Sequence, residues 1–236
     1  MARLGGLFWP ADLPEALAGP EARPILSLPP AVHPLFTPGA ASGPAPSPVS
    51  GLPETYVLYH GAGSEADLRR LLETWSWAAG PIGAYYPLVL AGLGPQERAR
   101  LEALLPAYGL EETVLALPEL DLPALAALYR GCQALLHPAP SAPWESPLRL
   151  ALALGRPAAA VETPLSAALA GPAAYLAPWE PGGRALGAAL ITLVVEEGLA
   201  GQLSAAARRR SAGWDPARFR EALGQAYASV SGPSGR

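Results

Sequence analysis

Residues 56–75 read YVLYHGAGSEADLRRLLETW, a sequence that joins a short apolar run to a glycine-containing turn and an amphipathic segment. The run from Tyr56 to Tyr59 has the length and composition of a buried parallel strand. Ser64 and Asp67 have the spacing of a helix capping box. The apolar residues that follow recur every three or four positions, which predicts one buried helix face; they are Leu68, Leu71, Leu72 and Trp75. The stretch is therefore a predicted strand, turn and helix.

The same alternation continues along the chain. Four more extended apolar runs predict strands, at residues 88–91, 113–117, 134–137 and 158–161. Helical stripes lie between them, and Pro95 and Gly109 have the positions of a first helical turn and a helix C-terminus. We therefore predict an α/β fold, a doubly wound, Rossmann-like parallel sheet of about six strands with helices on both faces.

The chain divides by composition into four parts. Residues 1–37 predict a strand–helix–strand stub, in which LFWP, a short helix from Asp12 to Leu17, and PILSLPP follow one another. Residues 38–53 form a Pro/Gly/Ser-rich linker, which is expected to be exposed and irregular. Residues 54–230 form the Rossmann-like domain and 231–236 a tail. Asp215 and Pro216 open a last helix that should pack onto the domain through Phe219, Leu223, Ala226 and Tyr227.

Composition excludes several classes of protein. Half of the 236 residues are apolar, the net charge is −4, and the longest apolar run, residues 185–195, is too short to span a membrane. We therefore expect a globular cytoplasmic protein without nucleic acid as its main partner. All the basic residues are Arg and there is no Lys or Asn, which suits a GC-rich, thermophilic source.

Two further features have simple structural interpretations. Cys132, the only cysteine, excludes an internal disulfide, and it is expected to be a small buried residue rather than a metal ligand. The basic run of Arg208, Arg209 and Arg210 is expected to be a solvated helical face.

Two segments at predicted carboxyl ends of strands could bind a ligand. The first is the turn formed by His60, Gly61, Ala62, Gly63 and Ser64, which precedes a capped helix and could face a phosphate. Tight-turn geometry alone would also explain the glycines, and His60 could be a structural histidine. We expect the sheet to bring this turn and the second segment to the same edge.

The second segment is the loop HPAPSAPWESP, residues 137–147, before the predicted helix 148–154. Trp144 could stack on a sugar ring, and Glu145 beside it could accept sugar hydroxyl groups. The alternative is that Glu145 caps the helix that follows.

Several segments, in order, resemble the C-terminal domain of retaining GT-B glycosyltransferases of family 4. They include YVLYHG, RRLLETW, LVLAGLG, LPELDLPALAALYRGCQALLHP, ALALGRP, VETPLSAALAGPAAYLAPWEP and SAGWDPARF. ILSLPPAVHPLFTP resembles the crossing between the two domains of these enzymes, with His33 in place of an aspartate. The resemblance, over residues 24–230, implies a sugar-nucleotide-binding fold.

The activity motifs of that family are largely missing. Where the resemblance implies an Arg or Lys and a second Lys that hold the donor diphosphate, this chain has Glu65, Ala66 and Asp67. Where it implies two glutamates eight positions apart, an ungapped alignment gives Ala142 and Leu150. A shortened loop could place Glu145 in the role of the first glutamate.

The resemblance thus leaves several functions open. The first is a catalytically degenerate or incomplete domain, a pseudoenzyme that binds a nucleotide-sugar, a glycan or a protein partner. The second is an active transferase that uses Glu145 and Arg149 in altered roles and takes its acceptor half from another chain; the third is a truncated relic. The candidate catalytic residue is Glu145, with no metal or cofactor expected. The candidate donor-binding residues are His60, Gly61, Gly63, Ser64, Trp144, Ser146 and Arg149.

Overall fold

The computed structural model describes residues 7–19, 25–37, 51–61, 63–144 and 146–231. Its centre is a six-stranded sheet in the order β5-β4-β3-β6-β7-β8, with every pair of neighbours parallel. The strands are β3 (Val57–His60), β4 (Leu88–Ala91), β5 (Val114–Ala116), β6 (Ala134–His137), β7 (Ala158–Val161) and β8 (Tyr175–Ala177). The doubly wound parallel sheet predicted from the sequence is confirmed.

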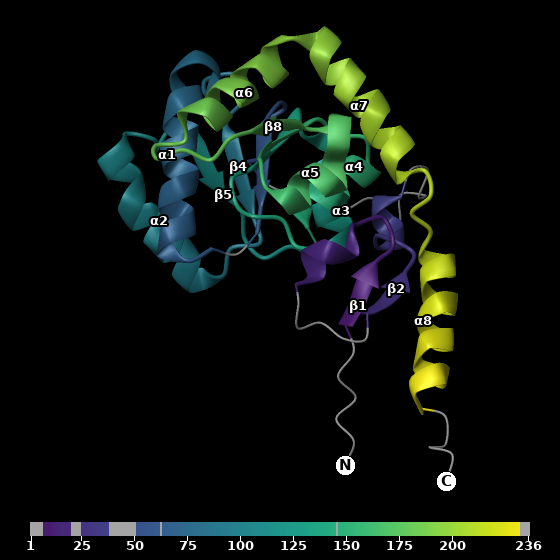
Figure 1. Ribbon diagram of the computed structural model, residues 1–236. Helices are drawn as coiled ribbons and strands as arrows, with labels where there is room; N and C mark the ends of the chain where they lie inside the picture. The colour runs from purple at the N-terminus through teal and green to yellow at the C-terminus, as the bar shows by residue number, and fades with distance from the viewer. Residues whose placement is uncertain (1–6, 20–24, 38–50, 62, 145, 232–236) are drawn as a thin grey trace.

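Helices cover both faces of this sheet (Figure 1). The helices are α1 (Glu65–Ile82), α2 (Pro95–Tyr108), α3 (Leu122–Gly131), α4 (Pro147–Ala153), α5 (Pro164–Ala170), α6 (Arg184–Val195), α7 (Glu197–Ser211) and α8 (Pro216–Ser231). Side chains of α1, α2 and α6 form one core with Val57 and Leu136. Side chains of α3, α4 and α5 form the other with Leu58 and Leu135. Alternate strand residues therefore point to opposite cores.

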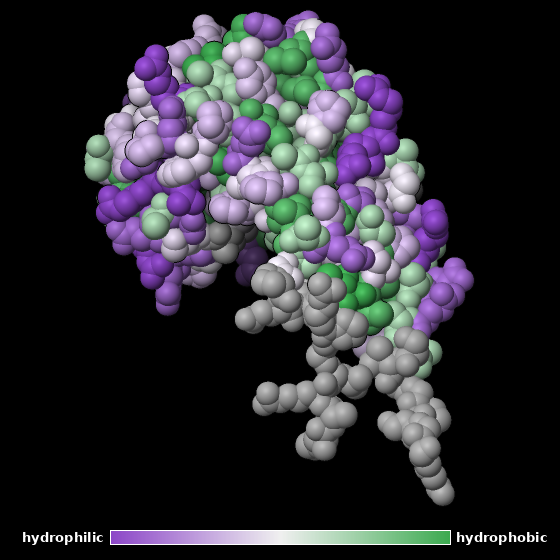
Figure 2. Space-filling view, viewed as in Figure 1, coloured by the Kyte–Doolittle hydropathy of each residue, from purple (hydrophilic) through white to green (hydrophobic). Residues whose placement is uncertain are grey.

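The predicted helix ends are confirmed in detail. Ser64 and Asp67 form the capping box of α1, and Pro95 is the first residue of α2. Gly109 ends α2 in the left-handed conformation, at φ 65°, which a residue with a side chain rarely adopts. Hydrophilic residues gather over α1 and α2 in Figure 2, so the buried stripes of these helices face inward.

The N-terminal piece differs from the expected strand–helix–strand stub in one respect. Strands β1 (Leu7–Pro10) and β2 (Ile25–Leu28) pair in parallel with each other, in a sheet of their own. The helix expected from Asp12 to Leu17 is instead a 3-10 turn, η1 (Glu15–Ala18), which follows Pro14. A segment this short, with a proline before it and a glycine after it, cannot sustain α-helical hydrogen bonding. A second such turn, η2 (Pro34–Phe36), follows β2.

The last helix begins at Pro216, as predicted, and it packs both onto the predicted domain, through Phe219 and Trp144, and onto the N-terminal piece (Figure 1). The Phe8 and Tyr227 rings are 5.6 Å apart, and the Trp144 and Phe219 rings 5.5 Å. The N-terminal piece and the last helix thus lie in contact with each other. Most of the predicted linker, residues 38–50, lies outside the described residues.

Candidate functional site

The carboxyl ends of β3 and β6 lie side by side at the point where the strand order reverses. Val57 and Leu58 of β3 pair with Ala134 and Leu135 of β6, so the strands run in register. The turn after His60 and the loop after His137 therefore leave the same edge of the sheet, as predicted. In open α/β sheets this edge, outside the switch point, is where ligands bind.

The turn after β3 needs its glycines. Gly61 has a φ of 147°, a conformation that residues with a side chain rarely adopt. A Cβ at Gly63 would lie 3.2 Å from the Cβ of Asp67 and 3.6 Å from the Tyr59 hydroxyl oxygen. Backbone N–H groups are thereby brought close to the start of α1, where an anion would be stabilised.

Carboxylates of the chain itself accept hydrogen bonds from these N–H groups. Gly63 N donates to Glu97 Oε1 at 3.0 Å, and Ser64 N donates to Asp67 Oδ2 at 3.0 Å. The other oxygen of Glu97 accepts from Gly94 N at 2.7 Å, so this side chain joins the starts of α1 and α2. A ligand phosphate at the turn would have to displace a carboxylate and then approach a second negative charge.

Two uncharged histidines, His60 and His137, are the last residues of β3 and β6. The Nδ1 of His60 lies 2.9 Å from the Tyr129 hydroxyl oxygen. His137 is 5% exposed, and neither of its ring nitrogens has a hydrogen-bond partner among the described residues. The pKa of each ring is lowered to about 4, that of His60 by burial and that of His137 by burial together with the proximity of His60. Both rings are therefore uncharged at neutral pH and offer no cation to a diphosphate.

The loop after β6 turns its predicted site residues toward the N-terminal piece and α4. Trp144 Nε1 donates to the carbonyl oxygen of Phe8 at 3.1 Å. Ser146 is fully buried, and its Oγ accepts from Leu148 N at the start of α4. The predicted catalytic residue, Glu145, lies outside the described residues.

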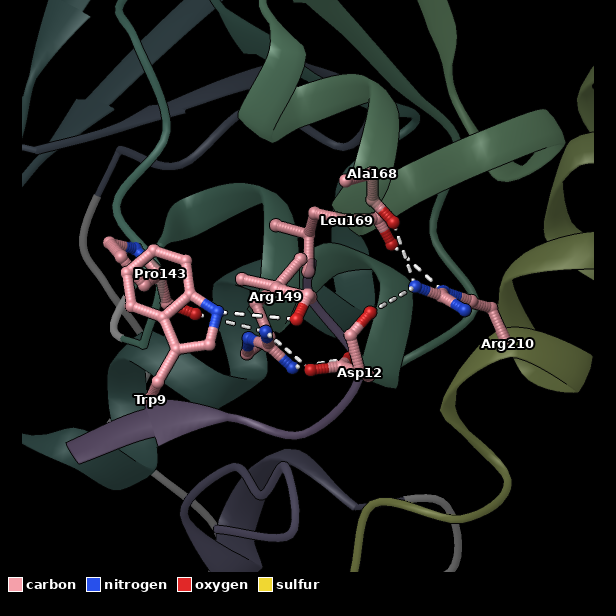
Figure 3. Close-up of polar contacts among 8 residues, drawn as sticks. Trp9, Asp12, Pro143, Arg149, Ala168, Leu169 and Arg210 are labelled. Atoms are coloured by element: carbon pink, nitrogen blue, oxygen red, sulfur yellow. Dashed lines mark hydrogen bonds and ion pairs between the residues drawn. The ribbon is translucent and has the colours of Figure 1, made fainter. Parts of the chain in front are cut away.

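Arg149 is committed to an ion pair beneath this loop (Figure 3). The buried guanidinium donates to both carboxylate oxygens of Asp12, at 3.1 and 3.3 Å, and to the carbonyl oxygen of Pro143 at 2.9 Å. It also stacks over the Trp214 ring, 4.6 Å from the centroid. These contacts hold its charge between the N-terminal piece, α4 and the segment before α8.

Arg210 corrects the expectation that the basic run of α7 is a solvated face. Its guanidinium donates to the carbonyl oxygens of Ala168 and Leu169 at the end of α5, and to that of Asp12 (Figure 3). A cation at a helix C-terminus is favourable, because the last carbonyl groups have no partner within the helix. Arg208 and Arg209 are exposed, as expected.

Sequence reasoning missed Glu97, Tyr129 and the partner of Arg149. A signal for Glu97 was present, since Gly94 and Glu97 have the spacing of a capping box at the start of a helix. Nothing in the sequence links Asp12 to Arg149, which are 137 positions apart. Cys132 is 1% exposed and burial raises the pKa of its thiol to about 12, which agrees with the predicted buried role.

Solved structures with a similar architecture are sugar-transferring enzymes. A sucrose-phosphate synthase from Thermosynechococcus elongatus superposes with a TM-score of 0.66 at 24% identity, over 87% of this chain and 52% of that one. WaaG, a glycosyltransferase involved in lipopolysaccharide biosynthesis, has a TM-score of 0.73 at 17% identity, over 96% and 62%. The fold matches that of GT-B glycosyltransferases. The GT-B-like chain spans about half to three fifths of these proteins' length.

HepE from Anabaena, solved in complex with UDP-glucose, is a third protein with the GT-B-like architecture. Its TM-score is 0.69 at 16% identity, over 91% of this chain and 60% of that one. At such identities the similarity establishes the fold alone. No protein-family model matches the sequence, and the search of curated proteins found no match.

Two other features of the structure concern metal binding and membrane spanning. Within the described ranges, no group of three or more His, Cys, Asp or Glu residues is arranged to hold a metal ion. No single helix in the described part of the chain is long and apolar enough to cross a membrane, although α6 and residues 197–228, bent by 97°, pass together by length and composition.

Proposed function

We propose that this chain is a degenerate donor-binding domain of the GT-B type, a pseudoenzyme related to the C-terminal half of retaining family 4 glycosyltransferases. Residues 54–230 would form that domain. The observation that carries the proposal is the turn after β3, where Glu97 and Asp67 accept the hydrogen bonds of Gly63 N and Ser64 N. The groups that would face a donor diphosphate are already paired with anions.

The electrostatics of the edge support a loss of catalysis. Transfer from a nucleotide-sugar leaves negative charge on the departing diphosphate, which preorganised donors or cations must stabilise. The chain has no Lys, the nearby histidines are neutral, and Arg149 is paired with Asp12. Loss of one preorganised donor typically lowers the rate by about a hundredfold to a thousandfold. An edge that presents carboxylates instead should lose more.

The chain spans about half to three fifths of the length of its structural neighbours, so the activity of a whole two-domain transferase is not carried over to it. An active alternative would take an acceptor half from another chain and would depend on Glu145. The domain would be cytoplasmic, and any residual ligand would be a nucleotide-sugar or a glycan.

A turnover assay distinguishes a degenerate domain from an active transferase. Release of UDP or GDP should be measured with UDP-glucose, UDP-N-acetylglucosamine and GDP-mannose over a range of sugar acceptors. We expect no release above the rate without protein. Turnover that disappears in the Glu145→Ala variant would contradict the proposal and assign catalysis to that residue.

A further inference from the structure

Two tryptophans stand half-exposed on the surface formed by α1 and the segment between β8 and α6. Trp77 is 48% exposed and Trp179 is 47% exposed, whereas Trp9, Trp75 and Trp214 are all buried. Three of the six tryptophans are thus buried, whereas these two side chains have about half of their surface in water. The residues Arg70, Trp77, Trp179 and Arg184 are called the Trp77–Trp179 patch below.

The patch is held rigidly because its two segments are joined. Trp77 Nε1 donates to the carbonyl oxygen of Gly182 at 2.9 Å, which fixes the segment before α6 on the surface of α1. Gly183 permits this approach, because a Cβ there would lie 2.3 Å from Thr74 Oγ1. A Cβ at Gly187 would likewise lie 2.7 Å from the Cβ of Trp77. Trp77 would therefore lose little side-chain freedom when a ligand binds to its ring.

An arginine guanidinium group lies over each of the two indole rings. The guanidinium carbon of Arg70 lies 4.4 Å from the Trp179 centroid, and that of Arg184 lies 5.4 Å from the Trp77 centroid. Arg184 is exposed and has no carboxylate within ion-pair distance among the described residues. The nearby carboxylate of Glu180 accepts from Ala185 N at 2.6 Å and so serves the start of α6. Arg70 donates to Asp67 Oδ1 at 3.5 Å, so the guanidinium edge that remains able to bind an anion is that of Arg184.

We propose that the Trp77–Trp179 patch binds an acidic carbohydrate, such as a chain of uronic acid residues. Aromatic faces stack on the C–H face of a sugar ring, and arginine forms charge-assisted, bidentate hydrogen bonds with a carboxylate. Trp77 with Arg184 would bind one sugar unit, and the Trp179 ring would stack on a neighbouring unit. The binding requires no nucleotide and does not depend on the edge at Gly63.

Other ligand classes fit the patch less well. A nucleic acid would need many phosphate contacts, more than the two arginines of the patch can supply. A protein partner usually anchors side chains in pockets. Two surface depressions, about 340 and 380 Å³ in volume, are lined by residues of α7 and the α5–η3 segment, among them Pro172, Ala206 and Arg209. Exposed indole rings suit a sugar ring, which can stack on an aromatic face without a pocket.

Calorimetric titration of the full chain tests the proposal with three probes. Hexagalacturonate offers ring faces and carboxylates, maltohexaose ring faces alone, and polyglutamate carboxylates alone. We expect binding of hexagalacturonate, with maltohexaose and polyglutamate weaker by roughly tenfold or more, since each lacks one of the two interactions. Trp179→Ala and Arg184→Gln should each weaken hexagalacturonate binding by about tenfold.

The matched control is Tyr85→Ala, which removes an aromatic residue that is 75% exposed and outside the patch. It should leave binding unchanged, and circular dichroism should show that all variants keep the fold. Equal binding of polyglutamate would indicate an acidic protein partner and overturn the proposal. It would also be overturned by equal binding of maltohexaose, by no binding of hexagalacturonate, or by binding that Trp179→Ala leaves intact.

Discussion

At the scale of single residues, Arg149 shows how a role depends on partners that are distant in the sequence. Sequence reasoning placed this side chain in a ligand site because it follows a loop at the carboxyl end of a strand. In the fold it is 0% exposed and its guanidinium meets Asp12, Pro143 and the Trp214 ring. A buried cation needs such compensation, because desolvation of an unpaired charge is expensive.

We expect Asp12→Ala to destabilise the fold by about 3–5 kcal/mol, because it leaves the buried Arg149 charge unpaired. The free energy of unfolding in urea measures this. Arg69→Ala is the control, since it breaks an exposed ion pair with Glu65 on one helix and should change stability little. Equal effects of the two substitutions would show that the buried pair has no special weight.

His137 should make the fold sensitive to acid. Its pKa is about 4 in the folded chain and 6.5 in a model peptide, so the unfolded chain takes up its proton first as the pH falls. Its stabilising effect is complete above about pH 6.5 and is lost toward pH 4, with a loss of about 3 kcal/mol. Urea unfolding at pH 7.5, 6 and 5 measures the slope, to which His60 contributes in the same direction. His137→Leu should flatten it; an unchanged slope in that variant would rule His137 out as the cause.

At the scale of elements, local patterns predicted most of the sheet. Strands β4, β6 and β7 begin and end where their apolar runs do, because a buried parallel strand must be apolar along its length. Strand β8 was not assigned, since its three residues at the sheet edge, Tyr175–Ala177, include an exposed tyrosine and no long apolar run.

The sequence predicted the turn after β3, but it did not predict that carboxylates accept hydrogen bonds from the N–H groups of that turn. The glycines and the capping box of α1 are local features, and they were read from adjacent residues. The Glu97 carboxylate reaches Gly63 from another helix, 34 positions away, and no local pattern gives that distance. Whether a helix start is free to bind a phosphate thus depends on tertiary structure.

The contact between α1 and α6 should depend on Gly183. We expect Gly183→Ala to destabilise the fold by about 2 kcal/mol or more, because the new Cβ would overlap Thr74 and φ is 65°. Gly201→Ala in α7 is the matched control: nothing lies within 4 Å of its Cβ position, and alanine favours a helix by about 0.5–1 kcal/mol. In thermal unfolding, Gly183→Ala should have a lower Tm than the wild type, and Gly201→Ala a higher one. A Gly183→Ala protein as stable as the wild type would contradict the close approach.

At the scale of the whole molecule, sequence periodicity predicted the class of fold and the resemblance predicted its relatives. Neither predicted where the N-terminal piece lies. Trp9, Leu13 and Phe36 are part of the same core as Leu58 and Leu135 of the sheet, and Arg149 and Arg210 both bind Asp12. The piece was expected to be a stub before a linker, and in the fold it is an integral part of the domain.

This arrangement predicts that the N-terminal piece stays bound after the linker is cut. Limited proteolysis should cleave first within residues 38–53, whose Pro/Gly/Ser-rich composition predicts an exposed segment. Both fragments should then elute together in gel filtration, because they share a core and a buried ion pair. In the Asp12→Ala protein the short fragment should dissociate more readily. Separation of the wild-type fragments under native conditions would contradict the shared core.

The central claim is that the chain's own carboxylates close the turn after β3 to a phosphate. Titration calorimetry with UDP tests it most directly, on the wild type, on Glu97→Gln, and on Glu102→Gln as a control at an exposed position of the same helix. We expect little or no UDP binding by the wild type and by Glu102→Gln, and measurable binding by Glu97→Gln, since a neutral glutamine makes a weaker hydrogen bond with Gly63 N than a carboxylate does and does not repel a phosphate. Tight binding of UDP by the wild type, unchanged in Glu97→Gln, would contradict the claim.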